Sequence, residues 1–288
     1  MHLKNRFDVG EFAVLVEMEP PKGIDISQMV TSATKVKTKV TAFAVPDMST
    51  AIMRMSALGG AAILQTKGMD TIMQMCCRDR NRLAIQGDLL AAYGCGITNI
   101  MVVKGDDISF GDHHQAKAVD DIDLYDLLGI IDVFRNSKDM GGGDLLGAPN
   151  FYCGTTVNAG LRGEALEAEL VEMKRRADSG VSFYITTPVF DLESISEFLK
   201  AVDIRKSNVI PTLMPLKSVG MARYISRNMK HIHIPAELID RLQKAPDKTK
   251  EGIRILRDGM EMVREGGFKG VMIQAMGFEP HLPEILGM

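Results

Sequence analysis

Residues 74–107, QMCCRDRNRLAIQGDLLAAYGCGITNIMVVKGDD, contain the pattern that decides the fold. An apolar run over residues 71–75 ends in the polar cluster RDRN, and a second apolar run over residues 99–103 ends in KGDD. Between the two runs, apolar residues recur with helical spacing and glycines mark the end of the helix. The stretch predicts a strand–helix–strand unit whose charged residues lie at the carboxyl edge of a parallel sheet, where such sheets bind ligands. The alternative is an ordinary loop with solvated charges, but two adjacent strands that end in the same way favour a site.

The composition is typical of a soluble globular protein. Of 288 residues, 45% are hydrophobic and 25% are charged, with a formal net charge of −3. This charge provides no basic field for nucleic acid, and no apolar run reaches the roughly 18 residues that a membrane span needs. The amino-terminal residues lack the features of a signal peptide, so we expect a cytoplasmic protein. The four cysteines show no zinc spacing, and we predict no metal site.

Short apolar strands alternate with helices along the whole chain. The strands are predicted at residues 12–16, 40–45, 71–75, 99–103, 151–153, 183–186, 209–214 and 270–275. One of the helices between them is predicted to begin with Ser49 as its cap and to end near Gln65. This alternation predicts a single (β/α)8 TIM barrel domain over residues 1–288. An open doubly wound sheet is the alternative, but no G-x-G-x-x-G follows the first strand.

A barrel brings all the strand exits to one mouth. The polar residues expected to converge there are Glu17, Gln74, Lys104, Asp106, Asn158, Thr187 and Gln274. Glu17 follows apolar residues, and partial desolvation would raise its pKa and suit it to donate a proton. Asp106 lies near Lys104 and is expected to stay ionised and to stabilise a cation. The alternative is that Glu17 and Glu19 are solvated or salt-bridged groups.

The arginines of the cluster at residues 78–82 allow two interpretations. Arg78, Arg80 and Arg82 could hold a phosphate, or they could form ion pairs with carboxylates such as Asp79. The sequence does not decide between these alternatives.

Several motifs together resemble one known family. They are EMEPPK at 17–22, RDRNR at 78–82, KGDD at 104–107, DSGVSFYITTPVFD at 178–191 and MPLKS at 214–218. In this order they are similar to methylenetetrahydrofolate reductase, and most similar to the short single-domain form of acetogenic bacteria and archaea. The resemblance covers residues 12 to 280, nearly the whole chain.

The resemblance implies a barrel that binds a flavin, FAD or alternatively FMN, and reduces methylenetetrahydrofolate to methyltetrahydrofolate in one-carbon metabolism. Glu17 matches the general acid of the family and Asp106 matches the carboxylate between flavin and folate. The residues implied to bind the flavin are Gln74, Asp79, Asn81, Lys104, Gly105, Asn158, Lys174 and Arg175. The residues implied to bind the folate are Asp106, Thr187 and Gln274.

Two departures from the family pattern concern the folate site. The family usually has Thr-Gln after the sixth strand, where the Gln binds the pterin, whereas this chain has Thr186-Thr187. After the fifth strand the family has His or Asn followed by Pro, and this chain has Asn158-Ala159. The electrons would come from a reduced pyridine nucleotide or from an electron-delivering subunit, and the chain could form a homo-oligomer or a hetero-oligomer. The alternatives are a paralogous flavin- or pterin-binding subunit without independent activity, an enzyme for another one-carbon carrier, or a barrel enzyme for a small anionic ligand.

Overall fold

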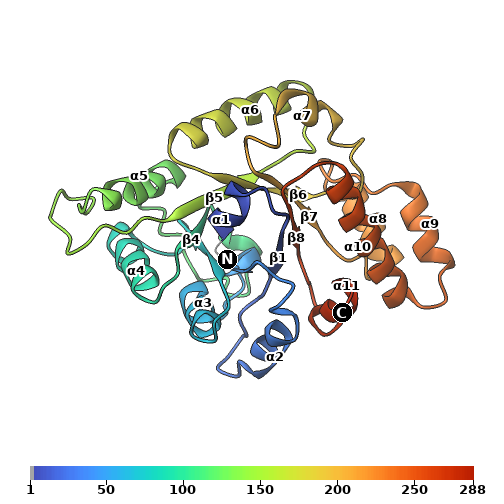
Figure 1. Ribbon diagram of the computed structural model, residues 1–288, viewed down its shortest axis with the longest axis horizontal. Helices are drawn as coiled ribbons and strands as arrows, with labels where there is room; N and C mark the ends of the chain where they lie inside the picture. Colours follow the sequence, from blue (N-terminus) through green and yellow to red (C-terminus); the bar gives the residue numbers. More distant parts are fainter. Residues whose placement is uncertain (1–2) are drawn as a thin grey trace.

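The computed structural model describes residues 3–288, and its centre is a closed barrel of eight parallel strands (Figure 1). The strands follow one another around the barrel in chain order, and the first pairs with the last. They are β1 (Ala13–Glu17), β2 (Ala42–Val45), β3 (Thr71–Cys76), β4 (Asn99–Val103), β5 (Tyr152–Val157), β6 (Phe183–Pro188), β7 (Val209–Leu213) and β8 (Gly270–Ile273). The predicted single (β/α)8 TIM barrel is confirmed. The predicted domain begins at residue 1, and residues 1 and 2 lie outside the described part.

Helices surround the barrel, and most of them bury apolar residues against it (Figure 1). They are α2 (Ser27–Val36), α3 (Ala57–Thr66), α4 (Arg82–Gly94), α5 (Leu124–Arg135), α6 (Gly163–Asp178), α7 (Ser196–Ala201), α8 (Val219–Asn228), α9 (Ala236–Lys244), α10 (Lys248–Glu265) and α11 (Leu282–Ile285). Helices α8 and α9 instead bury their apolar residues in a separate cluster beside the barrel. The described residues 3–288 also contain three short 3-10 helices, namely η1 (Ser49–Ala51), η2 (Ile108–Phe110) and η3 (Glu279–His281). Within residues 3–288, no helix is long and apolar enough to cross a membrane.

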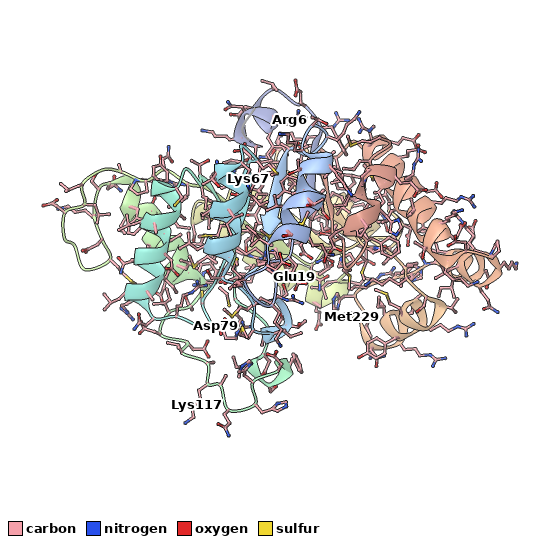
Figure 2. The ribbon with its side chains drawn as sticks, turned by 90° about the horizontal axis from the view of Figure 1, so that it is seen from below. Arg6, Glu19, Lys67, Asp79, Lys117 and Met229 are labelled. Carbon is pink, nitrogen blue, oxygen red and sulfur yellow. The ribbon has the colours of Figure 1, made fainter. Side chains whose placement is uncertain are left out.

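Helix α1 (Leu3–Asp8), which was not predicted from the sequence, closes the amino-terminal end of the barrel. Leu3 and Phe7 are buried together with the residues that the strands direct into the barrel. The ring of Phe7 lies 6.3 Å from that of Tyr152 and 6.5 Å from that of Phe183. Figure 2 shows Arg6 of α1 and Lys117 of the loop after β4 at opposite ends of the molecule. A ligand that enters the barrel must therefore come from the end where the strands terminate.

The helix predicted to run from Ser49 to Gln65 is interrupted. Residues 49–51 form only the 3-10 helix η1, and α3 begins at Ala57 with Ser56 as its N-cap. The Oγ of Ser56 accepts a hydrogen bond from the N–H of Gly59 at 3.2 Å. Met48, Thr50 and Ala51 have positive φ angles of 51°, 52° and 57°, which an α-helix does not allow. The prediction of one continuous helix was wrong because contacts with another loop hold this segment.

The ends of the strands also differ from those predicted. The fifth strand was predicted to end at residue 153, but β5 continues to Val157 through Gly154, Thr155 and Thr156. Thr155 is buried, and its hydroxyl donates to the carbonyl oxygen of Val102 at 2.8 Å. Pairing with β4 and β6 therefore keeps small and polar residues extended where the sequence alone indicates a loop.

The interruption leads to a stability prediction. We expect Ser56→Ala to lower the free energy of unfolding by about 1 kcal/mol, because it removes the N-cap of α3. Ser49→Ala should leave this free energy unchanged to within a few tenths of a kcal/mol, because Ser49 caps no α-helix. Urea denaturation of the two variants and the wild type measures the difference. A larger loss for Ser49→Ala than for Ser56→Ala would contradict the observed start of α3.

Candidate functional site

The carboxyl ends of the strands and the loops that follow them form the mouth of the barrel. The mouth encloses a cavity of about 490 Å³, within the size range of small-molecule sites. Every strand or the loop after it contributes to its wall. Its apolar floor is made by Met101, Val103, Ile185 and Met272. Polar residues surround this floor, so the cavity combines apolar surface with a few oriented polar groups, as ligand sites do.

Seven of the residues predicted to bind the cofactor or substrate or to act in catalysis lie together in this cavity. They are Glu17, Gln74, Lys104, Gly105, Asp106, Thr187 and Gln274. They come from β1, β3, β6 and the segments after β4 and β8, which are far apart in the chain. Asn158 joins them indirectly, because its Oδ1 accepts a hydrogen bond from the hydroxyl of Thr187 at 3.2 Å.

Glu17 is the last residue of β1, and its carboxyl group is shielded from water. The Nε2 of Gln274, after β8, donates to the Oε2 of Glu17 at 3.4 Å. Burial raises the pKa of Glu17 to about 7, the hydrogen bond from Gln274 opposes the rise, and the nearby Glu19 and Glu279 add to it. Glu17 therefore has the pKa of a group that donates a proton near neutral pH.

Asp106 occupies a different environment at the end of β4. Its Oδ2 accepts a hydrogen bond from the backbone N–H of Thr50 at 2.7 Å. Gly105, immediately before it, has a φ of +90°, and a Cβ at that position would lie 2.3 Å from the Sγ of Cys76. Glycine is therefore required where the chain turns from β4 towards the cavity. The two candidate carboxylates thus differ, because Glu17 is desolvated while Asp106 is held by a backbone donor.

The wall made by β6 and β7 is rich in threonine hydroxyls that bond to one another's backbone. The hydroxyl of Thr186 donates to the carbonyl of Thr187 at 2.6 Å, and that of Thr212 donates to the carbonyl of Thr186 at 2.6 Å. The N–H of Gly160 and the hydroxyl of Thr187 both donate to the Oδ1 of Asn158. Because the hydroxyl proton of Thr187 is already used, its oxygen is left to accept from a ligand.

Two pairs of predicted residues do not line the cavity. Asn81 is the N-cap of α4, and its Oδ1 accepts from the N–H groups of Leu83 and Ala84. Asp79 lies towards the mouth end of the molecule (Figure 2) and pairs with Arg78 at 2.6 Å.

Lys174 and Arg175 lie in the last two turns of α6, and both are exposed on the outside of the barrel. Lys174 lines a surface cavity between α6 and α7, and Arg175 covers the ring of Tyr125 at 3.6 Å. The helix runs back from the end of β5 towards the start of β6, which carries these residues away from the mouth. Their predicted contact with flavin phosphates is not supported by this placement.

The neighbouring Arg176 points inwards instead. Its Nη2 pairs with the Oε1 of Glu169 at 2.8 Å, and its Nη1 donates to the carbonyl of Thr156 in the cavity wall. Glu169 in turn accepts from the N–H of Asn158 at 3.2 Å. This link between α6 and the mouth was not predicted, because the sequence of adjacent charged residues on a helix does not reveal which one faces the barrel.

The arginines at residues 78–82 form ion pairs, which was one of the two interpretations of the cluster. Arg78 pairs with Asp79, Arg80 pairs with both Asp47 and Asp88, and Arg82 pairs with Asp121. Asp47 follows β2, lines the cavity and accepts from the N–H of Cys76 at 3.0 Å. Asp47 could have been predicted as a site residue in the same way as the others, because it is a polar residue that follows an apolar strand and Pro46. Among residues 3–288, no group of three His, Cys, Asp or Glu is arranged to hold a metal ion.

Comparison with solved structures supports the fold. An uncharacterized protein from Clostridium thermocellum, described as binding two copies of 5-methyl-5,6,7,8-tetrahydrofolic acid, superimposes with a TM-score of 0.63 at 16% identity, over 94% of this chain and 92% of that one. EDTA monooxygenase from a Chelativorans species gives a TM-score of 0.60 at 11% identity, over 96% and 93% of the two chains. 2,3-Dimethylmalate lyase gives 0.55 at 8% identity, over 98% and 82%. At these identities the likeness shows the barrel fold alone.

Comparison of sequences identifies the family. A Caenorhabditis elegans protein described as a probable methylenetetrahydrofolate reductase (NADPH) is 26% identical over 191 residues, which is 64% of this chain and 26% of the relative. The match thus spans about a quarter of that relative's length. The family model of methylenetetrahydrofolate reductase matches residues 2–288, almost the entire chain. On this match, the chain belongs to the methylenetetrahydrofolate reductase family.

Proposed function

We propose that the protein is a flavin-dependent oxidoreductase that reduces methylenetetrahydrofolate to methyltetrahydrofolate. The observation that carries the proposal is the presence of two carboxylates with different environments, Glu17 and Asp106, in one cavity at the mouth of the barrel. Membership of the family supports the reaction class. The folate ligand described for the Clostridium thermocellum protein, which shares the fold, supports the substrate class.

The cavity suits a flavin, with FAD as the proposed cofactor and FMN as the alternative. Its apolar floor of Met101, Val103, Ile185 and Met272 fits a flat ring system. Gly105 allows the turn after β4 that leads into the cavity, because its φ is positive and a Cβ there would collide with the Sγ of Cys76. Gln74, Lys104 and Asn158 are the residues that would hold the polar groups of the cofactor. When bound, the flavin supplies the hydride for the reduction.

Glu17 would act as the general acid towards the folate. Opening the five-membered ring of methylenetetrahydrofolate to an iminium cation requires a proton on the nitrogen that leaves. A carboxyl group with a pKa of about 7 is protonated in about half of the molecules at neutral pH and can deliver that proton. Gln274 keeps the carboxyl group in place by its hydrogen bond to Oε2.

Asp106 would stabilise the cation that Glu17 helps to create. The backbone N–H of Thr50 orients its carboxylate at the rim of the cavity. A fixed negative charge near a developing positive charge lowers the barrier, because the charge is already oriented before the reaction. The oxygen of Thr187, left as an acceptor, suits the N–H groups that a reduced pterin carries along its edge.

Two sources of electrons are proposed for the reduction of the flavin. A reduced pyridine nucleotide is one donor, and the C. elegans relative is described as an NADPH enzyme. The alternative is a separate electron-delivering subunit, with this chain as the flavin- and folate-binding partner. The replacement of the usual Gln by Thr187 is the sequence feature that favours this alternative or another one-carbon carrier as substrate. Turnover of the isolated chain with NADH or NADPH would exclude the need for a partner.

The first prediction concerns the complete reaction. We expect the purified protein to bind FAD and to be yellow. An electron donor should bleach the flavin absorbance. Methylenetetrahydrofolate should then restore this absorbance as methyltetrahydrofolate forms. Absorbance at the flavin band and product analysis measure the two steps. Dithionite replaces the physiological donor as a control, so that a missing partner does not hide the second step. A protein that binds neither FAD nor FMN would overturn the proposal.

Glu17→Gln separates the two half-reactions. We expect flavin binding and flavin reduction to be nearly unchanged, because Glu17 has no part in them. Folate reduction should slow by at least about 10²-fold, because general acid catalysis is typically worth that much. Stopped-flow measurement of each half-reaction tests the prediction. An equal slowing of both half-reactions would show that Glu17 has a structural role instead.

The raised pKa of Glu17 also predicts how stability depends on pH. In the unfolded chain the pKa is near 4.5 and in the folded protein it is about 7, so folding retains a proton between these values. The contribution of Glu17 to stability is therefore fully present below pH 4.5 and is lost as the pH rises through 7, whereas Glu17→Gln lacks this pH dependence. The difference between the two proteins should grow by roughly 3 kcal/mol over that window. Denaturant titrations from pH 4 to 8 measure it, and a constant difference would contradict the assigned pKa.

A further inference from the structure

The side chain of Arg78 connects three segments of the mouth. It is 4% exposed, although it lies on a segment that leaves the barrel. Its Nε and Nη2 bond to the two carboxylate oxygens of Asp79 at 2.8 and 2.6 Å. Its Nη1 donates to the backbone carbonyl of Asp106 at 3.0 Å, and Nη2 also donates to that of Met48 at 3.2 Å. One guanidinium group thus joins the exit of β3 to the segments after β2 and β4.

The segment after β2 adopts a conformation that needs such support. Met48, Thr50 and Ala51 all have a left-handed backbone. Each such residue costs roughly 1–2 kcal/mol when it is not glycine, so the segment would relax without outside contacts. The carbonyl oxygen of Ala51 packs so closely on Gly111 that a Cβ there would lie 2.2 Å from it. The segment is therefore pressed against the loop that follows Asp106.

The strained segment holds the proposed catalytic carboxylate. The N–H of Thr50 donates to the Oδ2 of Asp106, so the carboxylate is oriented by the same residues that carry the strain. Arg78 holds the carbonyl of Asp106 on one side and that of Met48 on the other. The position of the carboxylate therefore depends on contacts that Arg78 makes with the backbone of both partners.

We propose that Arg78 is a positioning residue for Asp106, acting through the segment of residues 48–51. The inference rests on the proposed function, which gives Asp106 its role towards the folate. Lysine cannot replace the arginine, because a single ammonium group lacks the fork that binds Asp79 in two places while reaching two carbonyls. Arg78→Lys keeps the positive charge but loses the arrangement of hydrogen bonds that the guanidinium group makes. Its effects therefore report on the position of Asp106.

The first test uses the protein without cofactor or substrate. We expect the amide of Thr50 to exchange with solvent at least about 10-fold faster in Arg78→Lys and in Asp106→Ala than in the wild type, because its hydrogen bond to Asp106 is weakened or lost. Arg82→Lys is the matched control, since Arg82 belongs to the same cluster but pairs with Asp121 on the surface. Exchange is followed by mass spectrometry of peptides covering residues 46–54. Unchanged exchange in folded Arg78→Lys would overturn the proposal.

The second test uses the flavin-loaded protein and a double-mutant cycle. Alone, Arg78→Lys should slow folate reduction by about 10²-fold, the loss expected when a reacting group moves by about 1 Å. It should also raise the reduction potential of the flavin in the direction that Asp106→Asn does, since the carboxylate moves away. In an Asp106→Asn background, Arg78→Lys should have little further effect on either quantity. Losses that multiply in the double variant would show that Arg78 acts independently of Asp106.

Asp79→Asn provides a second variant if Arg78→Lys does not fold. It leaves the guanidinium group in place and weakens the ion pair that orients it. We expect the same pattern of faster Thr50 exchange and a non-additive loss with Asp106→Asn. If the wild type reduces no folate at all, the proposed function fails, whereas the exchange experiment still decides whether Arg78 positions Asp106.

Discussion

The pairing of β1 with β8 closes the barrel, and the arrangement of the site depends on this closure. In a closed parallel sheet every strand ends at the same rim, so residues that are distant in sequence are forced together there. Glu17 and Gln274 are 257 residues apart and are hydrogen-bonded because the first and last strands are neighbours. Helix α1 fills the opposite end, which leaves the rim as the place where a ligand is received.

Closure also explains why two carboxylates at one rim differ in their chemistry. Glu17 ends a strand, so its carboxyl group remains partly inside the barrel and burial raises its pKa. Asp106 lies three residues beyond the end of β4 and is held from outside by the backbone of another loop. The distance of each residue from the end of its strand thus decides how much water it loses. This division suits one group to donate a proton and the other to carry a negative charge.

Buried charged side chains link the segments after β2, β3 and β4 on one side of the mouth. Arg78, Arg80 and Asp47 are buried or nearly so, and each bonds to at least two partners from different segments. Such a network fixes side chains that point into the cavity before any ligand arrives, which is how preorganised sites gain their effect. On the other side, β6 and β7 present threonine hydroxyls whose protons are already used. The hydroxyl oxygen of Thr187 is therefore left as an acceptor in the cavity.

The sequence by itself determined the strands, their alternation with helices and the family. Apolar runs that end in glycine and charge are local signals, so β4 was predicted at residues 99–103 and most strand exits were found. The hydrogen bond from Gln274 to Glu17, the left-handed segment at residues 48–51 and the position of Arg78 between three segments were decided only by tertiary structure. Each depends on contacts between residues that lie far apart in the chain, and no local pattern encodes them. Lys174 and Arg175 point outwards for the same reason. The side of α6 that packs against the barrel is the side on which Arg176 lies, so its two neighbours face away from the barrel.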